Sequence, residues 1–359
     1  MENNLKLLTL IVPSYNMERY LHRCLDSLVV DDDFTMNALD VIVVNDGSKD
    51  KTSEIAHSYA EKYPNTFRVI DKLNGNYGSC INAGLKVAQG KYARPLDADD
   101  YVVTANLQNI IKTLGEIDAD VIITDFTEVT DNCETLRERT FDLLTSNEMF
   151  NINDSLCRYE LPMHSLSYRT DLLRNMGYQQ TEGIFYSDQQ WNFLPFKTVK
   201  TLYYLPQKLY QYVMGRDGQS VDPVVEQKHM DSNTTVFLSL LQCMSTVDKQ
   251  SVTYKYMYHY LQRLSIHIYY AVLLAEPYSS DNDKLLREAD RKLMSLSPEL
   301  YDFLDEDTIS FNIRLIRRWR QEKATNIRLL KRTIPFYNLI LKWRHAFLKK
   351  VNKAISKNS

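Results

Sequence analysis

The sequence predicts an α/β fold in which a mainly parallel sheet carries helices on both faces, and three observations support this. Short apolar runs, typical of buried strands, alternate with segments of helical periodicity over the first hundred residues. The connections between them are short, as in doubly wound sheets. Polar clusters follow the strands, at the edge where such sheets bind ligands.

Four strands and three helices are expected in alternation before residue 97. The strand segments are apolar and end at turn-forming residues: 7–12, 40–44, 67–70 and 92–96. The helical segments repeat apolar residues every three or four positions: 17–28, 52–63 and 79–88, the last with Gly90 as its C-cap. A further helix is expected over 107–114, a strand over 121–124, and a late strand or a connector over 203–212. The pattern predicts three parts: a sheet domain at 1–220, a helical region at 221–310 and a basic tail at 311–359.

Composition indicates an ordinary globular protein, because 44% of the 359 residues are hydrophobic and 25% are charged. The five cysteines are widely spaced and form no Cys-x-x-Cys pair, which favours reduced thiols in the cytoplasm over a zinc or disulfide framework. The apolar run at 7–12 is too short for a signal peptide, and no stretch reaches the roughly 18 apolar residues of a spanning helix. Any membrane contact is therefore expected to be peripheral, on the inner membrane face.

Asp97-Ala98-Asp99 follows the fourth expected strand and is the first candidate for chemistry. Two carboxylates at this spacing repel each other unless a cation lies near them, and Mg²⁺ or Mn²⁺ prefers such oxygen ligands. A metal held there neutralises charge on a leaving diphosphate. The alternative is an acidic turn in which Asp99 or Asp100 caps the next helix.

Two further carboxylates follow apolar segments. Asp46 comes directly after the second strand, where it can accept a hydrogen bond from a base or ribose, or can bond its own turn. Asp188 lies among Phe185, Tyr186 and Trp191, whose apolar surface raises the pKa of a carboxyl toward that of a useful base. Its alternative role is to cap a helix that begins at Gln189. Lone histidines such as His22 and His164 are interpreted as structural.

Together these segments resemble glycosyltransferase family 2, an inverting family with a GT-A fold. Four motifs in order carry the resemblance: Leu-Thr-Leu-Ile-Val-Pro-Ser-Tyr-Asn from Leu8, Val-Ile-Val-Val-Asn-Asp-Gly-Ser from Val41, Asn-Gly-Asn-Tyr-Gly-Ser-Cys-Ile-Asn from Asn74, and Pro-Leu-Asp-Ala-Asp-Asp from Pro95. A weaker likeness continues to about residue 220. The resemblance implies transfer of a hexosyl or N-acetylhexosaminyl group from a nucleotide-diphosphate sugar, most often a UDP-sugar, to an acceptor hydroxyl.

The resemblance also implies a role for individual residues. Asp188 matches the general base, and Asp99 matches the metal ligand for Mg²⁺ or Mn²⁺. The residues implied in nucleotide-sugar binding are Pro13, Tyr15, Asp46, Gly78, Asn82, Asp97, Ala98 and Arg216. The acceptor implied is a glycan or a lipid-linked oligosaccharide of a bacterial envelope.

The chain departs from the family pattern at three places. Ile81 stands where many members have Arg, so one donor contact is absent, and Ser187 precedes Asp188 where Glu is usual. The Gln-Gln-Trp that follows Asp188 differs from the Gln-x-x-Arg-Trp of processive synthases. A non-processive enzyme that adds one sugar is therefore expected.

The last 49 residues are strongly basic, with 14 Lys and Arg against one acid in a chain whose net charge is −3. Aromatic and aliphatic residues recur there at helical spacing: Phe336, Ile340, Trp343, Phe347, Val351 and Ile355. A basic amphipathic helix of this kind can lie on an anionic membrane, and its alternative is packing on protein. No motif supports nucleic-acid binding.

Three other functions compete with the transferase interpretation. A degenerate transferase that serves as a membrane-associated binding or scaffold protein is the main alternative, and it predicts damage at the metal or base positions, which are intact. A nicotinamide-dependent dehydrogenase needs a Gly-rich turn after the first strand, where the chain has Pro13-Ser14-Tyr15-Asn16. A sugar-nucleotide pyrophosphorylase also needs a Gly-rich, basic first loop, so both are rejected.

Overall fold

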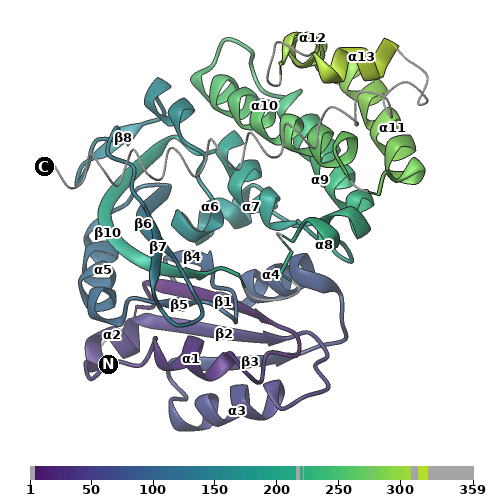
Figure 1. The fold of residues 1–359 in the computed structure, drawn as a ribbon. Coiled ribbons are helices and arrows are strands. Elements are labelled where there is room, and N and C mark those ends of the chain that lie inside the picture. Colours follow the sequence, from purple (N-terminus) through teal and green to yellow (C-terminus); the bar gives the residue numbers. More distant parts are fainter. Residues whose placement is uncertain (1–4, 216–218, 221, 276, 309–313, 322–359) are drawn as a thin grey trace, which may run out of the picture. The chain divides into compact units, whose positions relative to one another are not determined.

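The structure is a computed structural model that describes residues 5–215, 219–220, 222–275, 277–308 and 314–321 (Figure 1). Contacts group the chain into two units, Met1–Leu264 and Ser265–Ser359, and the division falls inside helix α10. Helices α8 and α9, which the sequence pattern assigns to a separate helical region, belong to the first unit. The amphipathic helix expected in the tail lies outside the described residues, as does Arg216.

Ten strands of the described residues form one sheet in the first unit. Their bounds are β1 (Leu8–Ser14), β2 (Leu39–Asn45), β3 (Phe67–Asp71), β4 (Tyr92–Pro95), β5 (Tyr101–Val102), β6 (Val121–Val129), β7 (Thr135–Arg139), β8 (Met149–Asn151), β9 (Leu166–Arg169) and β10 (Thr201–Val213). The order across the sheet is β3-β2-β1-β4-β9-β6-β10-β5, with β7 paired to β6 and β8 to β10. The α/β class is confirmed.

The sheet is mixed, which refines the expectation of a mainly parallel one. Strands β3, β2, β1 and β4 are mutually parallel, as are β6 and β10. Strand β9 lies between β4 and β6 and is antiparallel to both. All seven residues of β2 are buried, which explains its continuous apolar run, because a strand covered on both faces needs no alternation.

The first unit also contains helices, several of which pack against this sheet (Figure 1). Their bounds are α1 (Leu21–Asp26), α2 (Asp33–Ala38), α3 (Thr52–Lys62), α4 (Asn76–Val87), α5 (Thr104–Glu116), α6 (Thr170–Asn175), α7 (Asp188–Phe193), α8 (Pro223–Lys228), α9 (Met230–Met244) and α10 (Val252–Leu273), with 3₁₀ turns η1 (Asp154–Arg158), η2 (Met163–Ser165) and η3 (Leu194–Lys197). Helix α4 packs on β1 and β2, α3 on β2 and β3, and α5 on β10.

The C-cap predicted at Gly90 is wrong. Helix α4 ends at Val87 and Ala88 is its C-cap. Gly90 instead lets the chain pass close to β1: a Cβ there would lie 2.4 Å from the backbone nitrogen of Thr9. The backbone N–H of Gly90 also donates to Thr9 Oγ1 at 2.8 Å, so a tight backbone crossing explains this glycine.

The second unit consists of the end of α10 and three helices, α11 (Ser280–Leu296), α12 (Pro298–Glu306) and α13 (Leu315–Gln321). Trp319 is fully buried in it and donates from Nε1 to Asp283 Oδ1 at 2.6 Å. Arg320 pairs with Asp290 and Asp305 and lies 3.4 Å from the ring centroid of Tyr301. Among the described residues, every helix is too short or too polar to cross a membrane.

Candidate active site

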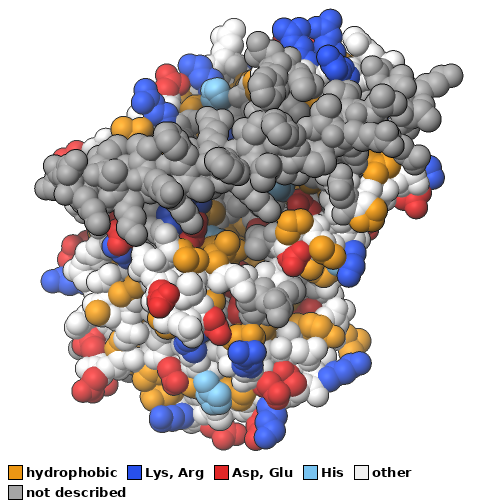
Figure 2. Space-filling model, viewed as in Figure 1, with side chains coloured by type: hydrophobic (Ala, Val, Ile, Leu, Met, Phe, Trp, Pro, Cys, Tyr) orange, Lys and Arg blue, Asp and Glu red, His pale blue; other side chains and the backbone are white. Residues whose placement is uncertain are grey.

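A cavity of about 470 Å³ lies at the carboxyl ends of β1, β2 and β4. Seven residues predicted from the sequence line it: Pro13, Tyr15, Asp46, Asp97, Ala98, Asp99 and Asp188. Their convergence follows from the parallel order of the strands, which brings the carboxyl ends to one edge. The prediction that the polar clusters meet in one crevice is therefore confirmed. On the face seen in Figure 2, acidic and basic side chains are interspersed around α3.

The connection after β1 is tied to the connection after β2. Asn16 adopts a positive φ of 56°, which Asn tolerates better than most residues, and so ends the strand in a turn. Its N–H donates to Ser48 Oγ at 3.0 Å, and its Oδ1 accepts from the N–H of Lys49 at 2.9 Å. These bonds fix the loop that carries Tyr15 beside the loop that carries Asp46.

Asp46 is buried and its carboxylate is ion-paired. Oδ1 accepts from Lys72 Nζ at 2.6 Å and from the N–H of Gly75 at 3.0 Å. Asp46 therefore bonds the β3–α4 connection, and Asn45 is the residue that bonds its own turn, through Oδ1 and the N–H of Ser48. The arrangement fixes the floor of the cavity next to Asn74, which also lines it.

The turn after β4 is organised by the hydroxyl of Tyr210, on β10. This hydroxyl donates to Asp100 Oδ2 at 2.7 Å and accepts from the N–H of Asp97 at 3.0 Å. Asp100 Oδ1 accepts from the N–H of Val213 at 2.7 Å, and burial raises the pKa of Asp100, with the charges of Asp99 and Asp97 adding to the effect. Helix α5 starts later, with Val103 as its N-cap, so neither Asp99 nor Asp100 caps it.

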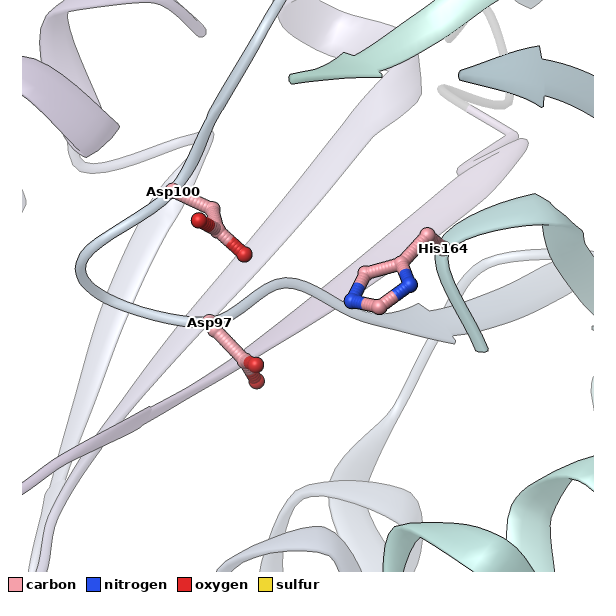
Figure 3. Close-up of side chains that lie close together, drawn as sticks. All are labelled: Asp97, Asp100 and His164. Atoms are coloured by element: carbon pink, nitrogen blue, oxygen red, sulfur yellow. The ribbon is translucent and has the colours of Figure 1, made fainter. Parts of the chain in front are cut away.

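His164 is a cavity residue that sequence reasoning missed. It comes from η2, and one ring nitrogen and one oxygen each from Asp97 and Asp100 lie within 4.8 Å of one another. Figure 3 shows the imidazole directed toward the two carboxylates from the opposite side of the site. The ring stacks on Tyr212 with centroids 4.2 Å apart, and burial lowers the pKa of His164 to about 3, helped by the charge of Arg94. No local pattern marks it, because the contact joins segments more than sixty residues apart.

The donors in this part of the cavity fit a divalent cation. Asp97 lies in the close group with Asp100 and His164, whereas Asp99 lines the same cavity without belonging to that group. Both Asp97 and Asp99 offer carboxylate oxygens, which are the ligands that Mg²⁺ and Mn²⁺ prefer. The neutral imidazole of His164 is an additional nitrogen donor. Both carboxylate oxygens of Asp100 already accept hydrogen bonds, from the Tyr210 hydroxyl and from the N–H of Val213, so the main role of Asp100 is to hold the turn.

Asp188 is the first residue of α7 and lines the same cavity. The N-cap position belongs to Ser187, so the helix begins one residue earlier than the capping interpretation assumed. Burial raises the pKa of Asp188 from 3.8 to about 6, although backbone N–H groups of the first turn oppose this. Tyr186, two residues before Asp188, has a positive φ of 60°, which is rare for an aromatic residue, and its hydroxyl donates to the carbonyl of Ser220 at 2.9 Å.

Gly78 and Asn82, two further residues implied by the resemblance, are not among the cavity residues. Asn82 lines a separate cavity of about 570 Å³ together with Lys72, Lys86 and Arg174, and its only acidic lining residue among those described is Glu182. Gly78 faces Thr181: a Cβ at Gly78 would lie 2.3 Å from the carbonyl oxygen of Thr181.

The profile of glycosyl transferase family 2 matches residues 9–171, which include strands β2 to β9, nearly all of β1, and the cavity residues from Pro13 to His164. Residues 9–171 form a glycosyl transferase family 2 domain. The family 2 resemblance carried by the four motifs is therefore confirmed over this range.

Two curated relatives match part of the chain at 37% identity. One is the uncharacterized glycosyltransferase EpsJ of Bacillus subtilis, over 116 residues that make up 32% of this chain and 33% of EpsJ. The other is the minor teichoic acid biosynthesis protein GgaB of the same organism, over 108 residues that make up 30% of this chain and 12% of GgaB. The chain thus matches a third or less of the length of these relatives.

A solved structure extends the likeness to almost the whole chain. The crystal structure of S. aureus TarS residues 1–349 in complex with UDP-GlcNAc superposes with a TM-score of 0.68 at 20% identity, covering 92% of this chain and 91% of that one. At this identity the likeness shows the fold. The GT-A fold followed by a helical region is confirmed.

Proposed function

We propose that the chain is an inverting, metal-dependent, non-processive glycosyltransferase that moves one sugar from a UDP-sugar to an acceptor hydroxyl. The observation that carries the proposal is the placement of Asp188, a carboxyl with a pKa of about 6, in the same cavity as Asp97 and Asp99. A base of that pKa is ionised at neutral pH and still accepts a proton readily.

The donor is proposed from the fold likeness to TarS, which was crystallised with UDP-GlcNAc. Pro13, Tyr15 and Asp46 line the end of the cavity formed by β1 and β2, where we place the nucleoside. Asp97 and Asp99 are the residues that would hold Mg²⁺ or Mn²⁺, and the bound metal would neutralise the charge of the departing diphosphate. The transferred group is a hexosyl or N-acetylhexosaminyl residue.

The chemistry assigned to Asp188 is a proton transfer coupled to one displacement. The acceptor oxygen gives its proton to the Asp188 carboxylate as it attacks the anomeric carbon from the face opposite the diphosphate. The bond from the anomeric carbon to the phosphate oxygen breaks, and its electron pair leaves with UDP. One displacement inverts the anomeric configuration.

The acceptor is proposed to be a glycan or a lipid-linked glycan of cell-surface polysaccharide synthesis. This rests on the motif resemblance and on the name of GgaB, a teichoic acid biosynthesis protein. The place of action proposed with it is the cytoplasmic face of the membrane, reached peripherally through the basic tail, whose expected amphipathic helix lies outside the described residues.

A calorimetric titration with UDP and a panel of UDP-sugars, with and without Mn²⁺, tests the proposal. We expect one UDP-sugar to bind only with metal, Asp99→Asn to abolish that binding, and Asp188→Asn to bind normally but to release no UDP. If the wild-type chain binds no nucleotide under any condition, the proposal is wrong and the scaffold alternative takes its place.

A further inference from the structure

Two residues that the family resemblance assigns to the donor, Gly78 and Asn82, lie one turn apart on α4 and both face the segment 178–183. That segment leads directly into the turn before Asp188. Residues Tyr77 and Cys80 of the same helix line the active-site cavity. Helix α4 is thus a shared wall: some of its side chains border the cavity, and others border the segment that leads to the base.

Asn82 holds this segment by three hydrogen bonds that use both ends of its amide. Its Nδ2 donates to the carbonyl of Gln180 and to Glu182 Oε1, each at 2.9 Å, and its Oδ1 accepts from the N–H of Gln180 at 2.9 Å. An amide that bonds both the N–H and the C=O of one residue pairs with the backbone as a neighbouring strand would. The bonds join residues 98 to 100 positions apart in the sequence.

Gly78 makes the approach possible. Its hypothetical Cβ would lie 2.3 Å from the carbonyl oxygen and 3.0 Å from the carbonyl carbon of Thr181, so no side chain fits there unless the backbone moves. The segment therefore packs directly on the helix backbone at one turn and is bonded by Asn82 at the next. A further backbone bond runs from the N–H of Gly183 to the carbonyl of Gly75 at 2.8 Å.

Gln190 carries the restraint from this segment to α7. It lies two residues beyond Asp188, in the first turn of the helix. Its Oε1 accepts from the N–H of Thr181 at 2.7 Å, and its Nε2 donates to Thr181 Oγ1 and to Ser239 Oγ, each at 2.9 Å. The chain of contacts thus runs from α4 through Asn82, residues 180–182 and Gln190 to the turn that begins with Asp188.

We propose that Asn82 is a positioning residue for the base: it fixes segment 180–182, and through Gln190 the first turn of α7, so that Asp188 is held at the cavity wall. This assignment replaces the donor contact that the resemblance implies for Asn82. It rests on the proposed role of Asp188 as the base that activates the acceptor.

The test compares Asn82→Ala with wild type in binding and in turnover. We expect the Kd of UDP with Mn²⁺ to change by less than about twofold, while kcat for UDP release from the UDP-sugar selected by the binding panel falls about 10- to 100-fold. A donor contact would give the opposite split, with Kd and KM raised and kcat retained. Lys86→Ala is the matched control, since Lys86 is exposed one turn further along α4 and, within the described chain, has no hydrogen bond to segment 178–183.

Two further readouts distinguish positioning from a general loss of stability. Burial sets the pKa of Asp188, so a loosened turn admits water and should move the acidic limb of the kcat profile down by about one pH unit. Hydrogen exchange in a peptide spanning 178–190 should accelerate at least about tenfold, with α3 unchanged. If exchange in that peptide equals wild type, the inference is overturned whatever happens to activity.

A second variant, at Gln190, keeps the test decisive if the Asn82→Ala chain does not fold. Gln190→Glu keeps an acceptor for the N–H of Thr181 but loses the two bonds that Nε2 donates, and it should give the same signature: UDP affinity kept, kcat lowered, exchange accelerated. A weakened UDP affinity with unchanged exchange in either variant would refute the positioning role. Failure of the proposed function is separate, because it appears as absent UDP binding or turnover in the wild-type chain.

Discussion

Replacing Asp188 by Asn should raise stability at neutral pH while removing activity. In the folded chain burial raises the pKa of Asp188 to about 6, against 3.8 for the unfolded chain. A carboxyl with a raised folded pKa favours the folded state fully below the unfolded value, and this contribution is lost as the pH rises through the folded pKa. The wild-type protein therefore carries an ionised carboxylate that costs stability above pH 6.

The magnitude follows from the size of the shift. A difference of about two pKa units corresponds to about 3 kcal/mol, at 1.36 kcal/mol per unit. The free energy of unfolding of wild type should fall by about that amount between pH 3.8 and 6, whereas the same curve for Asp188→Asn lacks this component. The stability advantage of the Asp188→Asn variant should thus be about 3 kcal/mol larger at pH 7.5 than at pH 3.5.

Urea unfolding of both proteins at a series of pH values measures this difference. Comparing the two pH values cancels any constant effect of exchanging an acid for an amide. Asp71→Asn, a substitution of an exposed carboxyl held by Asn45 and His57, is a control in which the sign is reversed, because those partners outweigh burial and lower the pKa of Asp71. If the advantage of the Asp188→Asn variant is the same at both pH values, Asp188 is not held in an environment that disfavours its charge, and the argument for its role as base fails.

Three other substitutions test the framework around the cavity. Gly78→Ala should destabilise the chain by about 1–3 kcal/mol in urea unfolding, because its Cβ would collide with the carbonyl of Thr181. Gly115→Ala, in helix α5, is the control: the nearest atom to its Cβ is a methyl carbon of Leu7 at 3.4 Å, so this substitution should be neutral or stabilising. Lys72→Met should cost about 3 kcal/mol by leaving the buried carboxylate of Asp46 unpaired, and Asp46→Asn in the same chain should restore part of it; no recovery in the double variant would contradict the pairing. Tyr210→Phe should lower the melting temperature and weaken Mn²⁺-dependent UDP binding, because the hydroxyl links Asp97 to Asp100; unchanged affinity would show that the turn keeps its shape without it.

The local sequence pattern was sufficient to predict strands β1 and β2, which form the end of the cavity where we place the nucleoside. Strands β1 and β2 are buried along almost all of their length, so their sequences are mainly apolar, with Thr9 and Asp40 as buried polar exceptions. A polar residue at the end of each strand marks where the chain leaves the sheet. The position of Asp46 follows from this pattern, and Asp97 comes after the shorter strand β4, which ends at Pro95. The antiparallel strand β9 could not be predicted in the same way, because its place between β4 and β6 depends on pairing with residues far away in the sequence.

The same limit applies to single residues: the sequence predicts which segment a residue belongs to, but not which distant segment packs against it. A resemblance in motif assigns a residue to a function shared by a family, and it places Gly78 and Asn82 near the donor because they belong to the segment after the third strand. Their contacts are decided by what packs on the other face of α4, which is a segment about a hundred residues later. A helix that borders two segments can serve the donor with one face and the base with another. Sequence spacing tells which residues share a face of α4, and only the packing of segment 178–183 tells which chemistry that face serves.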